Sequence, residues 1–205
     1  VQYKDYAVGS RDQQNVEKLD ADIQYWKEHL SGYEGLSLPA DFRRPAQLSG
    51  MGDFQRYTLG QPLQQKITDF AAEKNHSAFS IYLTGLYALL HYYSRQTSIN
   101  IGMPVANREH PDLLNVIGFF VNTVVNRVDI DPTESFGSFA ARVQQMLLSN
   151  LEHQEAPFDK VVEAINPERD LSRTPLFQIL VNYLKQPADQ FAGQYLKAND
   201  RDPLY

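Results

Sequence analysis

Cysteine is absent from this sequence. Its absence excludes disulfide bonds, thiolate metal ligands and a cysteine nucleophile. A protein without cysteine fits a reducing compartment, so we expect a cytoplasmic localisation. The chain begins with Val1 rather than methionine and shows no basic-then-apolar leader, and we interpret it as a piece of a longer polypeptide.

An excess of positive charge is lacking as well. The chain has 19 lysine and arginine residues against 25 aspartate and glutamate residues, which gives a formal net charge of −6. Proteins that bind nucleic acid need clustered positive charge to neutralise phosphates, so no nucleic-acid partner is expected. No apolar run approaches the ~20 residues of a membrane-spanning helix, so no membrane partner is expected either.

The residue patterns of several common active sites are missing. No spacing of Ser, His and Asp indicates a hydrolase triad, and no glycine-rich segment indicates a phosphate-binding loop. Metal ligands are not clustered along the sequence, so no metal site is expected. The histidines are all separate from one another, at positions His29, His76, His91, His110 and His153.

Apolar residues, by contrast, are plentiful. Hydrophobic residues make up 42% of the 205 residues and aromatic residues 12%, which is enough for one domain or one large lobe with its own core. Residues 12–31 predict an amphipathic helix, since Leu19, Ile23 and Trp26 recur at spacings of three and four. Helices and strands alternate along the chain, which predicts an α/β sandwich. We expect helices near residues 12–31, 62–70, 77–93, 135–152 and 158–165, and strands near 54–59, 98–103, 119–130 and 177–184.

Four short segments follow one another in order along most of the chain. They are Tyr3-Lys-Asp-Tyr-Ala-Val8, Ile117-Gly-Phe-Phe-Val-Asn-Thr-Val-Val-Asn-Arg127, His153-Gln-Glu-Ala-Pro-Phe158 and Arg169-Asp-Leu-Ser-Arg-Thr-Pro-Leu-Phe177. Together they resemble the later signature segments of the condensation domain of non-ribosomal peptide synthetases. Four segments in order are far more specific than one alone.

The resemblance implies a fold and a place within it. Condensation domains have a fold similar to chloramphenicol acetyltransferase, in which two similar lobes form a V with a tunnel between them. The family's catalytic motif, His-His-x-x-x-Asp-Gly, ends the first lobe, and no histidine here begins that pattern. The resemblance therefore implies that residues 1–205 are a two-layer C-terminal lobe. The N-terminal lobe, the extreme C-terminal part and any catalytic residue would be absent from this chain.

The resemblance also implies an activity in secondary-metabolite and antibiotic biosynthesis. A condensation domain joins a donor acyl or peptidyl thioester to an acceptor aminoacyl thioester, forming a peptide bond between substrates held on carrier proteins. This lobe would supply the acceptor-side tunnel wall and part of the carrier docking surface. Its partners would be the N-terminal lobe, the donor and acceptor peptidyl carrier domains and a neighbouring adenylation domain. Phosphopantetheine would arrive on the carriers, and this chain would bind no cofactor directly.

Two other functions remain open at the level of sequence. Condensation-like domains can serve only to recruit partners, without catalysis. Epimerisation and acyltransferase domains belong to the same superfamily, but the Phe-Val-Asn-Thr segment at 120–123 favours condensation over epimerisation. An intact or a degraded histidine motif in the polypeptide before Val1 would separate the enzyme from the recruiting module.

Candidate tunnel residues come from two of the segments. Asn122 is an amide inside an apolar strand pattern, where it needs hydrogen-bond partners. Backbone groups could satisfy it, or it could face the tunnel, and with the resemblance we favour the tunnel. Gln154 is a second candidate for the tunnel wall. His153, beside it, is expected to be structural, because a histidine at the end of a helix is favoured by the helix dipole.

Candidate supporting residues are charged. In the family, an arginine like Arg108 is expected to pair with the aspartate of the histidine motif, since a guanidinium can hold a carboxylate bidentately. The alternative is a solvated loop arginine. Arg169 and Asp170 are expected to clamp a loop, together with Arg173. The long connector 104–116 is expected to lie against the partner lobe.

Overall fold

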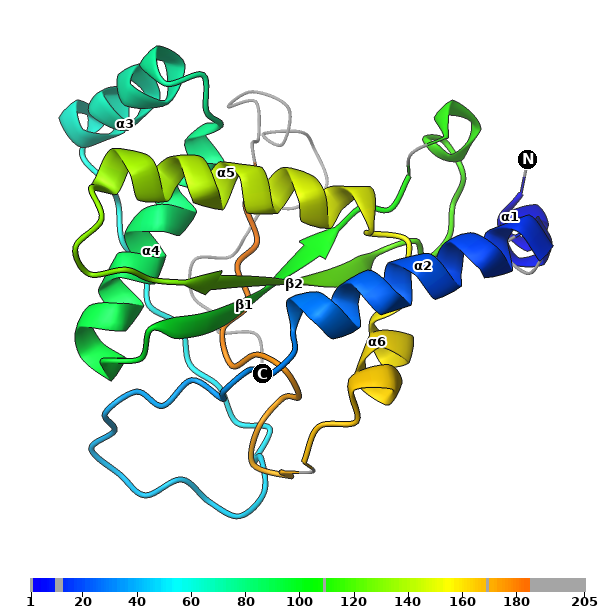
Figure 1. The fold of residues 1–205 in the computed structure, drawn as a ribbon, viewed down its shortest axis with the longest axis horizontal. Coiled ribbons are helices and arrows are strands. Elements are labelled where there is room, and N and C mark those ends of the chain that lie inside the picture. The colour runs from blue at the N-terminus through cyan, green and yellow to red at the C-terminus, as the bar shows by residue number, and fades with distance from the viewer. Residues whose placement is uncertain (1, 10–12, 109, 169, 185–205) are drawn as a thin grey trace, which may run out of the picture.

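An antiparallel pair of strands lies at the centre of the fold, and helices pack around it (Figure 1). The computed structural model describes residues 2–9, 13–108, 110–168 and 170–184. β1 (Ser98–Val105) pairs with β2 (Asn122–Asp129) over its whole length, with Ser98 opposite Asp129 and Val105 opposite Asn122. The helices are α1 (Tyr3–Gly9), α2 (Gln13–His29), α3 (Gln61–Glu73), α4 (Ala78–Ser94), the short 3-10 helix η1 (Pro111–Leu113), α5 (Phe136–Glu152) and α6 (Phe158–Ile165).

The helix boundaries follow ordinary capping chemistry. The Ser77 hydroxyl accepts the N–H of Ser80 at the start of α4, and the Ser135 hydroxyl accepts the N–H of Ser138 at the start of α5. Gly32 follows α2 with a positive φ of 66°, a backbone conformation that glycine adopts without strain. The predicted helices are therefore confirmed, with ends that differ by a few residues.

The core forms where α4 and α5 pack against the strands and where α2 packs on α6. Tyr87 of α4 is fully buried, and its hydroxyl donates a 2.7 Å hydrogen bond to the carbonyl of Asn126 in β2. This satisfied phenol ties the helix layer to the strand layer. The other large buried side chains come from α2 and the residue after it, α4, both strands, α5 and the segment after α6: Trp26, Leu30, Leu83, Ile99, Ile101, Val124, Val125, Val143 and Leu176.

A third chain segment lies along the free edge of β1. Gly102 donates to the carbonyl of Ile179 and accepts from the N–H of Val181, which makes one parallel bridge with Leu180. Gly102 is required here, because a Cβ atom would lie 2.6 Å from the ring of Phe177. The strand predicted at 177–184 is thus reduced to this single bridge within the described residues.

Two other strand predictions need correction. Residues 54–59 form no strand and are exposed along their whole length, because within the described part of the chain no strand lies beside them to pair with their backbone. The strand predicted at 119–130 begins only at Asn122 and ends at Asp129. The mixed α/β class is confirmed, but the expected alternation is not, because α1 to α4 precede both strands and α5 and α6 follow them. None of the described helices is long and apolar enough to cross a membrane.

Candidate functional site

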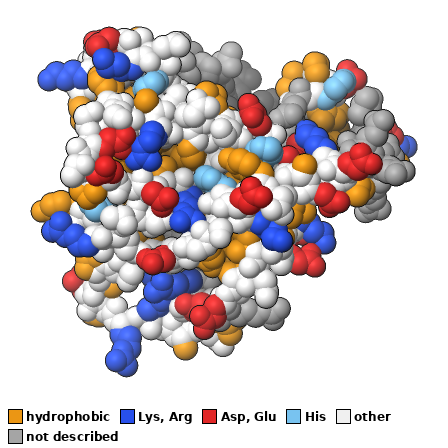
Figure 2. Space-filling view, in the orientation of Figure 1, with side chains coloured by type: hydrophobic (Ala, Val, Ile, Leu, Met, Phe, Trp, Pro, Cys, Tyr) orange, Lys and Arg blue, Asp and Glu red, His pale blue; other side chains and the backbone are white. Residues whose placement is uncertain are grey.

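The segment that leads into β2, residues 114–121, turns apolar side chains outward; we call it the leading loop. Ile117 is 97% exposed, Phe119 78% and Val121 50%. Phe120 points the other way and is only 3% exposed. In Figure 2, apolar side chains gather on the projection at the upper right, where Figure 1 places this part of the chain beside α1. Three neighbouring exposed apolar residues mark a surface that is suited to contact another molecule or lobe.

Arg108 holds the leading loop in place. Its guanidinium donates to the carbonyls of Leu113 and Val116, the latter at 2.8 Å, and its second terminal nitrogen lies 3.4 Å from the carbonyl of Gly118. The guanidinium plane also covers the ring of Phe120 at 4.1 Å. Arg108 thus links the carbonyls of the leading loop to the ring of Phe120 within this chain. Its expected pairing with an aspartate of another lobe stays a prediction.

The N-terminal helix α1 packs on the inner side of the same loop. Tyr3 and Tyr6 contact the ring of Phe120 at centroid distances of 5.2 and 4.8 Å, and the Tyr3 hydroxyl donates to the carbonyl of Phe119. Burial raises the pKa of Tyr6 above its usual 10.0. A Cβ atom at Gly118 would lie 2.4 Å from the Tyr3 ring, so only glycine allows this close approach.

The side chain of Asn122, the first residue of β2, forms hydrogen bonds with backbone groups. Its amide nitrogen donates to the carbonyls of Gln154 and Ala156, both at 2.7 Å, and its amide oxygen accepts the N–H of Phe158 at 3.1 Å. Backbone satisfaction was one of the two alternatives that the sequence left open. Tunnel lining by Asn122 and by the half-buried Gln154 stays a prediction.

Those partners belong to the turn between α5 and α6, residues 153–157, which we call the α5–α6 turn. Helix α2 holds its other side. The ring nitrogen Nδ1 of His153 lies 2.6 Å from a carboxylate oxygen of the buried Asp22, and the indole of Trp26 donates to the carbonyl of His153 at 3.0 Å. The His153 ring also stacks on Tyr25 at 3.8 Å. His153 is therefore held against α2 by three contacts, and its purely structural role stays a prediction.

Two residues of the expected loop clamp, Asp170 and Arg173, lie beside each other, while the role of the clamp stays a prediction. Asp170 accepts the N–H of Ser172 at 2.8 Å and lies 3.5 Å from the guanidinium of Arg173. Its hydrogen bonds from Ser172, and then the charge of Arg173, hold the pKa of this carboxyl below its usual value. Arg44, which is distant in the sequence, donates a hydrogen bond to the carbonyl of Ser172 at 3.2 Å. Arg169, which was also expected in the clamp, lies outside the described residues.

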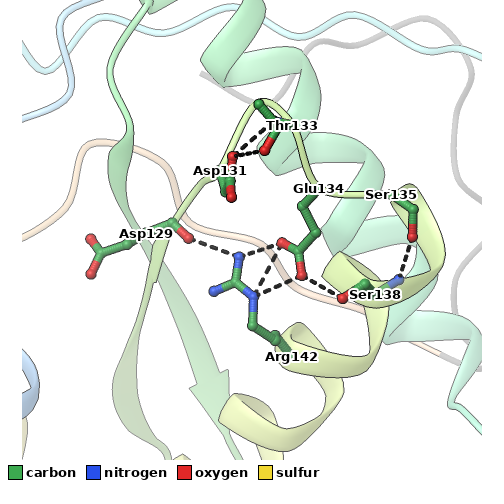
Figure 3. A network of polar contacts seen from close by, with 7 residues as sticks. All are labelled: Asp129, Asp131, Thr133, Glu134, Ser135, Ser138 and Arg142. Atoms are coloured by element: carbon green, nitrogen blue, oxygen red, sulfur yellow. Dashed lines mark hydrogen bonds and ion pairs between the residues drawn. The ribbon is translucent and has the colours of Figure 1, made fainter.

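A polar network lies at the start of α5, beside a cavity of about 580 Å³ (Figure 3). Arg142 donates to both carboxylate oxygens of Glu134 and to the carbonyl of Asp129, while Ser138 donates to Glu134 at 2.6 Å. The hydrogen bond from Arg142 is the largest cause that lowers the pKa of Glu134. The Ser138 hydroxyl lies beside a carboxylate, but Glu134 is bound by Arg142 and its pKa is lowered, which makes it a poor base for activating a hydroxyl. The network joins the turn between β2 and α5 to the first turns of α5 (Figure 3).

The remaining histidines make separate contacts, although His29 and His153 both stack on the ring of Tyr25. His91 contacts the carbonyl of Gln96 at 2.8 Å, and His29 accepts the N–H of Arg127 at 3.4 Å. Burial, followed by the nearby charge of Arg127, lowers the pKa of His29 to about 4. Among the described residues, no group of three His, Cys, Asp or Glu side chains could hold a metal ion.

The sequence analysis missed the contribution of α2 to this region. Asp22 is only 4% exposed, and its carboxyl group lies between α2 and the α5–α6 turn. A signal was present, because Asp22 falls on the same helical stripe as Leu19, Ile23 and Trp26, where an acidic residue requires a partner. Which partner it would find could not be read from the spacing.

Known proteins resemble this chain along most of its length. The family model of the condensation domain matches residues 1–202. The chain belongs to the condensation domain family. Enniatin synthase of Fusarium equiseti is 39% identical over 184 residues, which cover 88% of this chain and 6% of that protein. A phosphinothricin tripeptide synthetase of Streptomyces viridochromogenes is 38% identical over 180 residues, which cover 87% of this chain and 17% of that protein.

Solved structures of condensation domains and their relatives share the fold. A four-domain nonribosomal peptide synthetase bound to AMP and glycine matches with a TM-score of 0.79 and 32% identity, over 82% of this chain and 13% of that one. The X-domain from teicoplanin biosynthesis matches with a TM-score of 0.77 and 26% identity, over 88% of this chain and 41% of that one. The chloramphenicol acetyltransferase-like α/β fold is therefore confirmed. This condensation-domain chain spans only a small part of the synthetases that it matches.

Proposed function

We propose that this chain is the C-terminal lobe of a peptide-bond-forming condensation domain. The donor is an acyl or peptidyl thioester and the acceptor is an aminoacyl thioester, each carried on the phosphopantetheine arm of a carrier domain. The lobe supplies the acceptor-side tunnel wall and part of the carrier docking surface. Membership of the family supports the reaction class, and the matched synthetases support a setting with carrier and adenylation domains.

The proposed chemistry depends on positioning. The acceptor amine attacks the carbonyl carbon of the donor thioester, a C–N bond forms, the C–S bond breaks, and the donor thiol leaves with a proton. Holding both substrates in one tunnel makes this aminolysis effectively intramolecular. The histidine motif of the N-terminal lobe would act as the base or anchor the amine, and the present chain would contribute no catalytic residue.

The outward-facing apolar side chains of the leading loop are the observation that carries the lobe assignment. Ile117 and Phe119 are strongly exposed, yet the loop beneath them is held by Arg108 and packed on α1. A loop that is fixed in shape and apolar on its outer side is suited to a permanent neighbour rather than to solvent. We assign that neighbour as the N-terminal lobe.

An assay with two loaded carrier proteins tests this proposal. The chain is assayed alone and then together with a separately supplied N-terminal lobe, and the dipeptidyl product is measured. We expect product only from the mixture. Product from the chain alone would contradict the assignment, because catalysis would then reside in residues that have structural places here.

A non-catalytic recruiting module is the second candidate. It is favoured by one comparison, since a solved relative, the X-domain from teicoplanin biosynthesis, is found in complex with OxyB; that structure matches with a TM-score of 0.78 and 26% identity. The same assay separates the two candidates. Stable binding of a partner protein by the complete domain, with no product from loaded carriers, would favour recruitment.

A further inference from the structure

The amide of Asn122 spans the α5–α6 turn with all of its hydrogen-bonding groups. Two N–H groups meet two carbonyls, of Gln154 and Ala156, and the oxygen meets the N–H of Phe158. Among side chains of this length, only asparagine offers two donors and an acceptor at once. Its three hydrogen bonds therefore form only when the turn has this backbone conformation. A carboxylate of the same size has no N–H groups and cannot make the two bonds to the carbonyls.

One of these bonds also completes helix α6. The residue before α6 is Pro157, whose side chain makes no capping hydrogen bond. The first N–H groups of a helix have no partner within the helix. Asn122 supplies one from another element, because its oxygen accepts the N–H of Phe158, the first residue of α6.

The turn is held from the opposite side by α2. Asp22 binds the ring of His153, Trp26 binds its carbonyl, and Lys18 reaches Glu155 at 2.6 Å. The α5–α6 turn is thus fixed between α2 and the first residue of β2. Asn122 directly follows the exposed Val121, so it joins the fixed turn to the outward-facing leading loop.

We infer that Asn122 is a positioning residue, which sets the α5–α6 turn, and with it Gln154, relative to the leading loop. This inference rests on the proposed function, since the turn and the loop are taken to form adjacent parts of one tunnel wall. Asn122 acts through backbone groups and does not touch the reacting atoms. Loss of its amide lets the turn and the loop shift independently.

The test replaces the amide and follows both the turn and the reaction in the complete condensation domain. Asn122→Asp keeps the size and the acceptor but places an oxygen against two carbonyls, while Asn122→Ser keeps one donor. Hydrogen exchange is measured across residues 154–160, and kcat and KM are measured with loaded carriers. We expect faster exchange in this stretch and a kcat lower on the order of 10- to 100-fold for the Asp variant, with a smaller change for Ser. KM for the carriers should stay unchanged.

Asn100→Asp is the matched control. Asn100 is a buried asparagine of β1 whose amide donates to the carbonyl of Leu176 at 2.9 Å, away from the α5–α6 turn. This variant should lower stability without raising exchange at residues 154–160 and without lowering kcat per folded molecule. Unchanged exchange at the turn in Asn122→Asp would overturn the inference, and so would faster exchange with an unchanged kcat.

Failure of the proposed function gives a different result. If the unmodified complete domain forms no product, the proposed reaction is wrong and a positioning role in it falls as well. The exchange measurement still decides whether Asn122 holds the turn, because it does not depend on activity.

Discussion

At the scale of single residues, two polar side chains organise the loop and turn that the family segments mark. Arg108 binds carbonyls of the leading loop and covers Phe120, while Asn122 binds backbone groups of the α5–α6 turn. Both side chains supply hydrogen-bond partners to main-chain groups that would otherwise have to find them in water. Their partners are carbonyl and N–H groups, which have no sequence signature, so only the residues themselves could be predicted.

Replacement of Arg108 should lower the stability of the fold more directly than it affects the reaction. Arg108→Ala leaves three carbonyls without their charged donor, and we expect the free energy of unfolding to fall by about 2–3 kcal/mol. Arg108→Lys should restore less than half of this, since an ammonium group lacks the planar fork. Thermal unfolding and product formation are measured together, with the exposed Arg43→Ala as control. Full stability with lost activity in Arg108→Ala would contradict the structural role.

His29 should make stability depend on pH. Its pKa of about 4 lies below the usual 6.5, so between these values the unfolded chain binds a proton that the folded chain does not. The contribution of His29 is complete above pH 6.5 and is lost as the pH falls toward 4, by at most about 3 kcal/mol. Protonation would also remove the acceptor for the N–H of Arg127.

Urea unfolding at about pH 7 and about pH 5 measures this effect. His29→Gln is the comparison, because its amide oxygen can accept the same N–H without titrating in this range. The decrease in stability between the two pH values should be smaller in His29→Gln than in the unmodified chain. Equal decreases would show that other groups account for the pH dependence.

At the scale of elements, α2 contributes both to the core and to the α5–α6 turn. Its buried Trp26 and the adjoining Leu30 belong to the core cluster, and the same helix turns Asp22 and the indole N–H toward His153. The amphipathic pattern predicted the helix and its inner face. The polar contacts depend on the position of His153 at the end of α5, and the residue pattern within α2 gives no information about that position.

Removal of the Asp22 carboxylate should loosen this attachment. Asp22→Ala leaves the His153 ring without its buried partner, and we expect a loss of about 1–3 kcal/mol. The exposed Asp20→Ala is the control and should be nearly neutral. Trp26 is the only tryptophan in the chain and is 2% exposed, so its fluorescence reports the release of α2 during unfolding. A midpoint for Asp22→Ala equal to that of Asp20→Ala would show that the pair contributes nothing.

At the scale of the whole molecule, the chain combines a well-packed core with unusually exposed apolar residues. The leading loop exposes Ile117 and Phe119, and the segment 42–57 exposes Phe42, Met51 and Tyr57 by more than 80% each. The two surfaces differ in how many contacts fix their backbone. Arg108 and α1 hold the leading loop, whereas residues 51–60 belong to no helix or strand.

The isolated chain should therefore self-associate through the leading loop. A rigid apolar surface loses little conformational entropy on contact, so it favours association more than a loop that must first be ordered. Light scattering over a range of concentrations should show oligomers of the unmodified chain. The double variant Ile117→Ser with Phe119→Ser should remain monomeric.

The control for this prediction carries two changes of the same kind in the other segment, Phe42→Ser with Met51→Ser. It should still associate, although both original side chains are almost fully exposed. If it is the control that becomes monomeric, the segment 42–57 drives association instead. Addition of the N-terminal lobe should suppress self-association of the unmodified chain if the proposed function holds.

By itself the sequence determined the five longer helices α2 to α6, the approximate positions of strands β1 and β2, the family and the general fold; it predicted neither α1 and η1 nor the pairing of the two strands. These depend on periodicity, on capping serines and on short ordered segments such as residues 117–127, all of which are local properties. It could not determine that residues 54–59 remain unpaired or that residues 177–184 make a single bridge, because a strand requires a neighbour from elsewhere in the chain. The tertiary structure alone decided that Asn122 faces the α5–α6 turn, that Asp22 meets His153 and that Arg108 binds carbonyls. Those contacts join residues far apart in the chain or depend on the path of a loop, and the folded backbone alone brings their partners within hydrogen-bond distance.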